Sequence, residues 1–271
     1  LTQYMSQRLG AEYRGVLAEN HPTDDRFGGQ VHPRPKVTTG IVYRAARFEV
    51  KNTDRWMPFG RGFARQPKTC DERSNNSGYE TLRVKLHDKK ADKDVVVVST
   101  RQWTWHACTA KNMAEIVDGH DGGENDHAGL GRAAALDIIA GDFNDRLFDG
   151  STGDYRCWYR EMNRQLGVGA DDAGCARRDL GFTDPLFQFC HGEKSCVKSH
   201  AGIDSVFVRR TDGQPAHTDH FDVVTFAEAH RASVHATGGD GPSNVPQRDG
   251  HGDVADRYSG HEARRAYVYY H

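Results

Sequence analysis

The chain has 271 residues, of which 37% are hydrophobic and 27% charged, and its formal net charge is -2 at pH 7. This length supports one large core, and the composition excludes an intrinsically disordered chain and a broadly basic polyanion-binding protein. No apolar run reaches the roughly 18 residues of a membrane-spanning helix, so we expect no membrane span. We expect a single domain over residues 1–271 that acts as a monomer.

The first part of the chain predicts a helix followed by strands. Leu1, Met5 and Leu9 recur at a spacing near four, as on one face of an amphipathic helix. Residues 79–86 alternate apolar and polar side chains, and the valine-rich run 94–100 follows a polar turn. This pattern predicts a hairpin whose second strand is buried on both faces. Shorter strands are predicted at 41–43 and 48–50.

The rest of the chain alternates predicted helices and strands. Residues 119–131 and 235–257 are rich in Gly and Asp and are predicted to be loops. No Rossmann or Walker glycine pattern follows a strand, so a nucleotide-cradling fold finds no support. The helices are predicted at 107–117 and 155–166, and the strands at 136–140, 203–208, 221–226 and 266–270.

The run 136–145 joins an apolar strand to a polar turn. Gly141 lets the backbone turn, Asp142 supplies an anionic oxygen, and Asn144 supplies a neutral oxygen and an amide donor. This combination suits a hard cation. A simple Asx turn is the alternative interpretation, because Asp and Asn favour turns on their own account.

The six cysteines have no C-x-x-C spacing, which disfavours a structural zinc site. Two pairs bracket short segments and could close as local disulfides, Cys190 with Cys196 and Cys157 with Cys175, leaving Cys70 with Cys108. The alternative is six buried free thiols in a cytosolic protein. Since disulfides persist in oxidising compartments, we expect a secreted protein.

Four strand ends carry polar motifs whose order resembles one known family. The motifs are Ser-Thr-Arg at 99–101, Gly-Asp-Phe-Asn at 141–144, Ile-Asp at 203–204 and Ser-Gly-His at 259–261. In this order they resemble the endonuclease/exonuclease/phosphatase superfamily, which includes the pancreatic-type deoxyribonucleases. The resemblance extends over nearly the whole chain, and Gly-Asp-Phe-Asn is its most specific element.

The resemblance implies a fold and a reaction. The fold is α/β (α+β), a four-layer sandwich of two mixed β-sheets flanked by helices. The reaction is phosphodiester hydrolysis by in-line attack of water, which needs a base, a cation at the phosphoryl oxygens and donors for the added negative charge. The implied cation is Mg²⁺, or Mn²⁺ or Ca²⁺ in its place.

The residues at these motifs have the chemistry for such roles. The unperturbed pKa of a histidine lies near neutrality, so His261 would act as base or proton carrier, and Asp204 would orient it. Asp142 and Asn144 would hold the attacking water, the metal or a phosphate oxygen, and Arg101 would stabilise the phosphorane electrostatically. The expected catalytic set is Asp142, Asn144, Asp204, His261 and Arg101; the expected metal ligands are Asp142, Asn144 and His261; Arg61 and Arg65 are expected to bind substrate phosphate.

Three departures from the family pattern bear on activity. The family's N-terminal Asn-bearing strand and metal-binding Glu have no counterpart in the chain, Arg101 replaces a histidine, and Gly260 replaces an aspartate. Arginine cannot act as a general base, because its pKa stays above about 12. These departures leave open a catalytically weakened relative that binds nucleic acid or a phosphorylated partner. The candidates to compensate locally are His106, Asp145, Asp256 and Glu262.

The expected function is a secreted, metal-dependent nuclease acting on DNA or RNA. A phospholipid or phosphomonoester substrate is the alternative, because the metal chemistry is indifferent to what the phosphate carries. At a net charge of -2, a polyanion must bind a local basic rim, for which we expect Arg61, Arg65, Arg101 and Arg209. Trp103 and Trp105 follow the valine strand and would either stack on bases or pack in the core.

Overall fold

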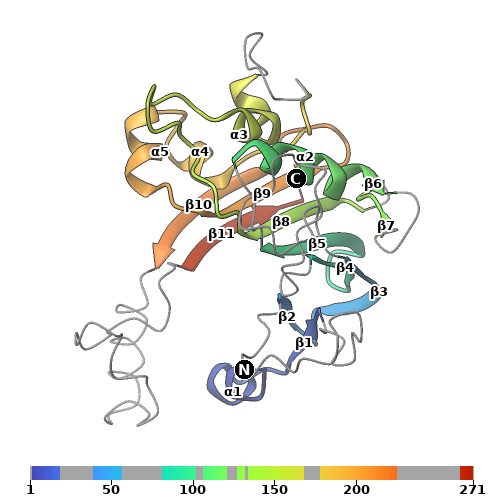
Figure 1. Ribbon diagram of the computed structural model, residues 1–271. Helices are drawn as coiled ribbons and strands as arrows, with labels where there is room; N and C mark the ends of the chain where they lie inside the picture. The colour runs from blue at the N-terminus through green and yellow to red at the C-terminus, as the bar shows by residue number, and fades with distance from the viewer. Residues whose placement is uncertain are drawn as a thin grey trace, which may run out of the picture.

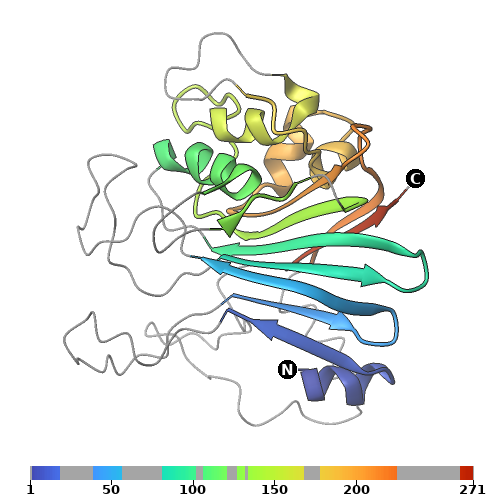
Figure 2. The same cartoon turned by 90° about the vertical axis from the view of Figure 1, so that its right-hand side faces the viewer.

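The structure is a computed structural model, and its path is shown in Figures 1 and 2. None of the helices in the described part of the chain is long and apolar enough to cross a membrane. The described residues are 2–18, 39–56, 81–101, 106–120, 127–131, 134–167, 178–224 and 263–270.

A five-stranded mixed sheet forms the centre of the molecule, with strand order β3-β4-β5-β8-β9. Its neighbours pair antiparallel except β5 and β8, which are parallel. A parallel pair needs a long crossover, and α2 (His106–Asp118) lies in this one. The predicted hairpin of β4 and β5 is confirmed. The strands are β3 (Phe48–Trp56), β4 (Thr81–Asp88), β5 (Lys93–Arg101), β8 (Leu136–Asp142) and β9 (Asp204–Arg210).

Helices cover one face of this sheet (Figure 2). Side chains at alternate strand positions, among them Val98, Ile139 and Phe207, share one core cluster with Met113 of α2 and Trp158 of α3 (Cys157–Met162). Trp158 stacks on Phe143 and meets Phe207 edge-on. Two short helices, α4 (Pro185–Phe189) and α5 (Lys194–His200), join the same cluster through Phe187 and Val197.

Two antiparallel strand pairs cover the other face. The pair β1 (Tyr13–Leu17) and β2 (Gly40–Arg44) packs Ile41 against Leu82 and Val84 of β4. The pair β10 (His217–Val224) and β11 (Ala263–Tyr269) packs Val268 against Val208 of β9. The predicted helix at the N-terminus is α1 (Thr2–Leu9), which lies against β1. The α+β sandwich class is therefore as predicted, and the second sheet consists, in the described residues, of these two separate pairs.

Some elements differ from their predicted bounds. The helix predicted over 155–166 breaks at Asn163 into α3 and the short helix η3 (Arg164–Leu166), because the Asn163 side chain accepts the Gln165 N–H. The predicted loop 119–131 contains a two-stranded ribbon of β6 (Gly119–His120) and β7 (His127–Ala128). The strands β1, β6 and β7 and the helices α4 and α5 were not predicted, and the predicted loop 235–257 lies outside the described residues.

Candidate active site

Three of the predicted site residues lie in one row across the central sheet. In the strand register Arg101 is paired with Asp142, and Asp142 is paired with Asp204. Because β5 and β8 are parallel and β9 runs back, the ends of the first two strands and the start of the third meet at one edge of the sheet (Figure 1). Residues that are 41 and 62 positions apart in the chain thus become nearest neighbours.

The row carries an ion pair. The Nε atom of Arg101 lies 3.3 Å from Oδ2 of Asp142, and both side chains are mostly shielded from solvent, with exposures of 28% and 11%. Asp204 stands on the other side of Asp142, and like charges at directly opposed strand positions repel each other. A cation between or beside the two carboxylates offsets this repulsion, and Arg101 supplies one such charge.

The turn after β8 is held in a single conformation. Asp142 accepts the Asn144 backbone N–H at 2.8 Å and the Asn144 side-chain amide at 3.1 Å. Asn144 adopts a left-handed backbone conformation with φ of 48°, which asparagine tolerates well. The Asx turn and the polar site are therefore one arrangement, in which the side-chain amide nitrogen of Asn144 faces Asp142.

Phe143 anchors this turn to the core. Its ring is buried, stacks on Trp158 and meets Phe207 edge-on at 5.4 Å, and its N–H donates to the Ile203 carbonyl oxygen at 2.8 Å. The turn cannot move without unpacking these aromatic rings. The polar residues on either side of Phe143 are consequently preorganised.

The donor set fits a hard divalent cation. Two carboxylates and an amide oxygen at one sheet edge are the ligand types that Mg²⁺, Mn²⁺ and Ca²⁺ prefer. Within the described residues the only close group of three potential ligand side chains is Cys190, Cys196 and His200, and its sulfurs form a disulfide. No such group among the described residues includes Asp142.

Several predicted site residues lie outside the described residues, namely His261, Arg61 and Arg65, as do Trp103 and Trp105. The strand that follows His261 is described, and it begins at Ala263. Arg264 in this strand donates a hydrogen bond to the His200 carbonyl oxygen, so the start of β11 lies beside the segment that leads into Asp204. Nothing in the local sequence singled out Arg264, which stands in an aromatic strand.

The disulfide between Cys190 and Cys196 is as predicted. It joins the end of α4 to α5. Cys157 is also disulfide-bonded. The pairings of Cys175, Cys70 and Cys108 remain predictions.

Two expectations are corrected. Arg209 does not belong to a basic rim at the site, because it lies near the far end of β9 and its Nε and Nη2 bond to the buried carboxylate of Asp137 at 3.0 and 2.7 Å. Asp145 does not replace a missing metal ligand, because its buried carboxylate pairs with Arg156 at 3.2 Å and accepts the Thr109 hydroxyl. A buried carboxylate needs such partners, so both aspartates are structural.

The marked pKa shifts of the described residues lie away from the row. Burial raises the pKa of Asp137 and of Asp184 to about 6 in each case. The pKa of Asp88 falls to about 2: burial opposes the shift, but hydrogen bonds from Arg47, Tyr270 and two backbone amides outweigh it. Each of these aspartates joins structural elements. The assignment of the candidate site therefore depends on its geometry and not on a pKa shift.

Comparison with known proteins gives matches among solved structures only. No family profile and no curated protein sequence matches the chain. Solved structures do resemble it, and they include endonuclease/exonuclease/phosphatase family proteins from Bacteroides thetaiotaomicron and Bacteroides vulgatus. These two are 12% and 10% identical to the chain, at TM-scores of 0.43 and 0.38.

Three of these structures illustrate the level of similarity. TDP2 from D. rerio, complexed with a single-strand DNA product, is 15% identical at a TM-score of 0.43, over 82% of this chain and 72% of that one. The human Nocturnin catalytic domain with bound sulfate is 11% identical at 0.42, over 82% and 65%. A mannosyl-6-phosphatase from Bacteroides thetaiotaomicron is 13% identical at 0.41, over 82% and 70%. Similarity at this level assigns no activity, substrate or partner to the chain.

Proposed function

We propose that the protein is a divalent-metal-dependent phosphodiesterase that cleaves nucleic acid by in-line attack of water. The observation that carries the proposal is the row of Arg101, Asp142 and Asp204 across three neighbouring strands, with Asn144 fixed beside it. This row places carboxylates, an amide and a guanidinium at one edge of the sheet. Phosphoester hydrolysis needs this combination of metal ligands and phosphate donors.

Each residue has a separate task in the proposed reaction. Asp142 and Asn144 would hold the ion, which when bound acts as a Lewis acid at the phosphoryl oxygen. Arg101 donates N–H groups to non-bridging oxygens and stabilises the charge that develops on them. His261 would take a proton from the attacking water, Asp204 would orient His261, and Arg61 and Arg65 would hold the flanking phosphates of the strand.

The substrate and the compartment are part of the proposal. A net charge of -2 gives the molecule no attractive long-range field, so a nucleic acid would be held by local arginines and its binding would weaken steeply with salt. The disulfide between Cys190 and Cys196 supports secretion, because disulfides persist in oxidising compartments. We propose that the secreted protein acts as a monomer.

Cleavage assays with matched variants test the function. Supercoiled plasmid, single-stranded RNA and a bis-aryl phosphodiester would each be incubated with Mg²⁺, Mn²⁺, Ca²⁺ or EDTA. Asp142→Asn and Asp204→Asn should each lower turnover at least about 100-fold, because a charged group at the reacting phosphate is lost. The control is Asp92→Asn, at a side chain that is 95% exposed in a turn. Turnover that survives EDTA or both site variants would refute the proposal.

A second function is favoured by the ion pair itself. Arg101 already places a cation on the carboxylate that would bind metal, and this arrangement suits binding of phosphate without cleavage. Fluorescence anisotropy with labelled single-stranded DNA distinguishes the two. Tight binding that needs no divalent ion, with no cleavage under any metal, would identify a nucleic-acid-binding relative.

A further inference from the structure

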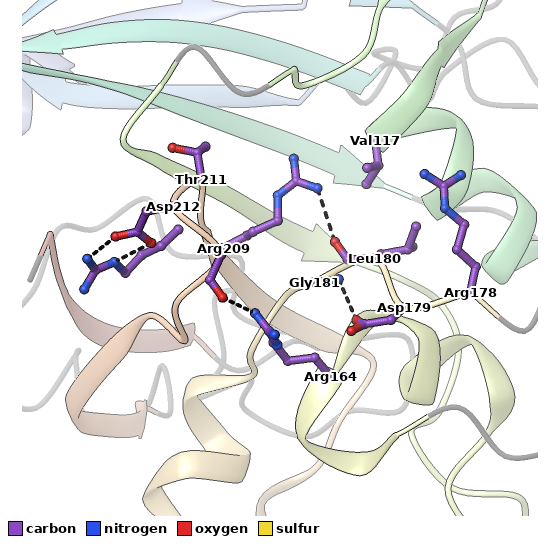
Figure 3. A pocket seen from close by; sticks show the side chains of 11 residues that line it. Val117, Arg164, Arg178, Asp179, Leu180, Gly181, Arg209, Thr211 and Asp212 are labelled. Carbon is purple, nitrogen blue, oxygen red and sulfur yellow. Dashed lines mark hydrogen bonds and ion pairs between the residues drawn. The ribbon is translucent and has the colours of Figure 1, made fainter.

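The geometry points to a second ligand site, for a small phosphate-bearing molecule with hydroxyl groups, at the end of the sheet opposite the candidate active site. A cavity of about 310 Å³ opens there between the end of β9, the turn that follows it and the segment that leads to Phe182 (Figure 3). This volume is at the lower end of the range for ligand pockets. Four arginines, Arg164, Arg178, Arg209 and Arg210, line it.

The cavity is separate from the proposed catalytic row. Asp204 is the first residue of β9 and Arg210 is its last, so the strand itself spans the gap. At about 3.3 Å per residue this strand separates the two sites by roughly 20 Å. The inference therefore does not depend on the proposed function.

Arg209 forms a fixed wall of the cavity. Its guanidinium bonds to Asp137 and to the Leu180 carbonyl oxygen at 3.2 Å, and it lies 4.8 Å from the centre of the Phe182 ring. The carboxylate of Asp137 is fully buried and balances this charge. Since separating a buried pair leaves an uncompensated charge, Arg209 stays in place when a ligand binds.

Arg164 is the arginine best placed to receive an anion. Its Nη1 donates to the Gly213 carbonyl oxygen at 2.7 Å, which holds the guanidinium at the cavity (Figure 3). Among the described residues no carboxylate forms an ion pair with it. A guanidinium has five N–H donors, so one bond to a carbonyl leaves both its charge and most of its donors for phosphate oxygens.

Arg178 and Arg210 can add to this charge at low cost. Arg178 pairs with Asp118 and Arg210 pairs with Asp212, and the side chains of these two aspartates are 44% and 50% exposed. Exposed ion pairs contribute only about 0–1 kcal/mol, so a phosphate dianion can compete with them for either arginine. A phosphate held by Arg164 can therefore draw on a second guanidinium group of the cavity lining.

Asp179 selects the rest of the ligand. It lines the same cavity, and its Oδ1 accepts the Gly181 N–H at 2.7 Å, which holds its carboxylate in position. A carboxylate repels a second anionic group but accepts hydrogen bonds from hydroxyl groups. The cavity thus fits a hydroxylated monophosphate better than a polyanion such as nucleic acid.

Calorimetric titration of the full chain in EDTA tests this site, with ribose 5-phosphate, ribose and inorganic phosphate as separate probes. We expect ribose 5-phosphate to bind, inorganic phosphate to bind more weakly, and ribose not to bind. Arg164→Gln should weaken ribose 5-phosphate binding about tenfold, the effect of losing one charge-assisted contact. Arg210→Gln should weaken it several-fold, and it serves as a second variant if Arg164→Gln lowers the melting temperature.

Two control variants locate the binding. Arg14→Gln, at a side chain that is 64% exposed on β1, should leave the affinity unchanged. Arg101→Gln at the catalytic row should also leave it unchanged. Equal affinity in the wild type and in both cavity variants would overturn the inference. Loss of binding in Arg101→Gln alone would assign the phosphate to the catalytic row instead, and absence of binding by the wild type would refute the site.

Discussion

Gly141 is the residue that lets strand β8 present Asp142 beside strand β5. Its φ of 152° is rarely adopted by residues with a side chain, and a Cβ atom there would overlap the backbone carbonyl oxygen of Thr100 on the neighbouring strand. The close approach of the two backbones keeps Arg101 within ion-pair distance of Asp142. A single hydrogen atom in place of a side chain is thus a condition for the site.

Gly141→Ala should lower the free energy of unfolding by at least about 3 kcal/mol, because the added methyl group forces β5 and β8 apart and strains the backbone. The measurement is urea denaturation followed by tryptophan fluorescence. Gly150→Ala is the matched control, since a Cβ at that position meets no atom within 4 Å. If the two variants unfold at the same urea concentration, the inference that the backbones of β5 and β8 approach closely at Gly141 is wrong.

In the proposed mechanism Arg101 would compete with the metal ion for Asp142, because the two side chains form an ion pair. Arg101→Gln should lower kcat about 100-fold, since a donor to the transition state is lost. It should also tighten Mg²⁺ binding several-fold, because the ion no longer competes with a guanidinium. Titration of Mg²⁺ against initial rate, with Arg14→Gln as control, measures both. Weaker Mg²⁺ binding in the variant would contradict the competition.

At the scale of elements, a buried carboxylate organises the start of helix α4. Asp184 accepts the Leu186 N–H at 2.8 Å as the N-cap of the helix, and Tyr159 of α3 donates its hydroxyl to the same side chain at 2.5 Å. Burial raises the pKa of Asp184 to about 6, while the Tyr159 and backbone hydrogen bonds and the distant charge of Arg264 oppose the shift. The carboxyl group of Asp184, which can titrate, thereby joins helix α4 to helix α3.

The sign of the resulting pH dependence follows from this raised pKa. Between about pH 4 and pH 6 the folded protein keeps a proton that the unfolded chain releases, so the free energy of unfolding falls as the pH rises through this window. In the Asp184→Asn variant the free energy of unfolding should fall by about 2–3 kcal/mol less over this window, because asparagine does not titrate. The asparagine oxygen should still cap helix α4. Asp137, whose pKa is also raised to about 6, keeps its own share of the slope. Urea denaturation at pH 4, 5, 6 and 7 measures the difference, and identical slopes would contradict it.

At the scale of the whole molecule, Asp88 connects the end of the chain to the central hairpin. Its buried carboxylate accepts two N–H groups of Arg47, at 3.0 and 2.7 Å, and the hydroxyl of Tyr270 at 2.8 Å. Tyr270 follows β11, so this carboxylate ties the last strand to β4. Segments that are 182 residues apart meet at this group.

Tyr270→Phe should destabilise the protein by about 1–2 kcal/mol at neutral pH, since one hydrogen bond to a charged group is lost. The pKa of Asp88 is lowered to about 2, so this contribution is present above about pH 4 and disappears as the pH falls through 2. Thermal unfolding of variant and wild type at pH 7 and pH 2 should therefore differ at the first pH and converge at the second. A difference that persists at pH 2 would place the effect elsewhere.

The sequence by itself determined the local features of this protein. The valine-rich run 94–100 and the run 136–140 predict buried strands because they are mostly apolar, and the alternation over 79–86 predicts the first strand of the hairpin. The Asp142 turn and the Cys190–Cys196 disulfide are equally local, since each joins residues a few positions apart. Features of this kind can be predicted because they depend only on residues that are close together in the sequence.

Only the tertiary structure decided which residues face one another. Arg101, Asp142 and Asp204 align because burial of Val98, Ile139 and Phe207 under the helices sets the register of three strands that are distant in the chain. The same register carries Arg209 away from the predicted rim and buries its partner Asp137. The alternation of buried and exposed side chains within a strand can be read from the local sequence, but the pairing between strands depends on the packing of the whole core. That packing places a candidate catalytic row at one end of the sheet and an arginine-lined cavity at the other.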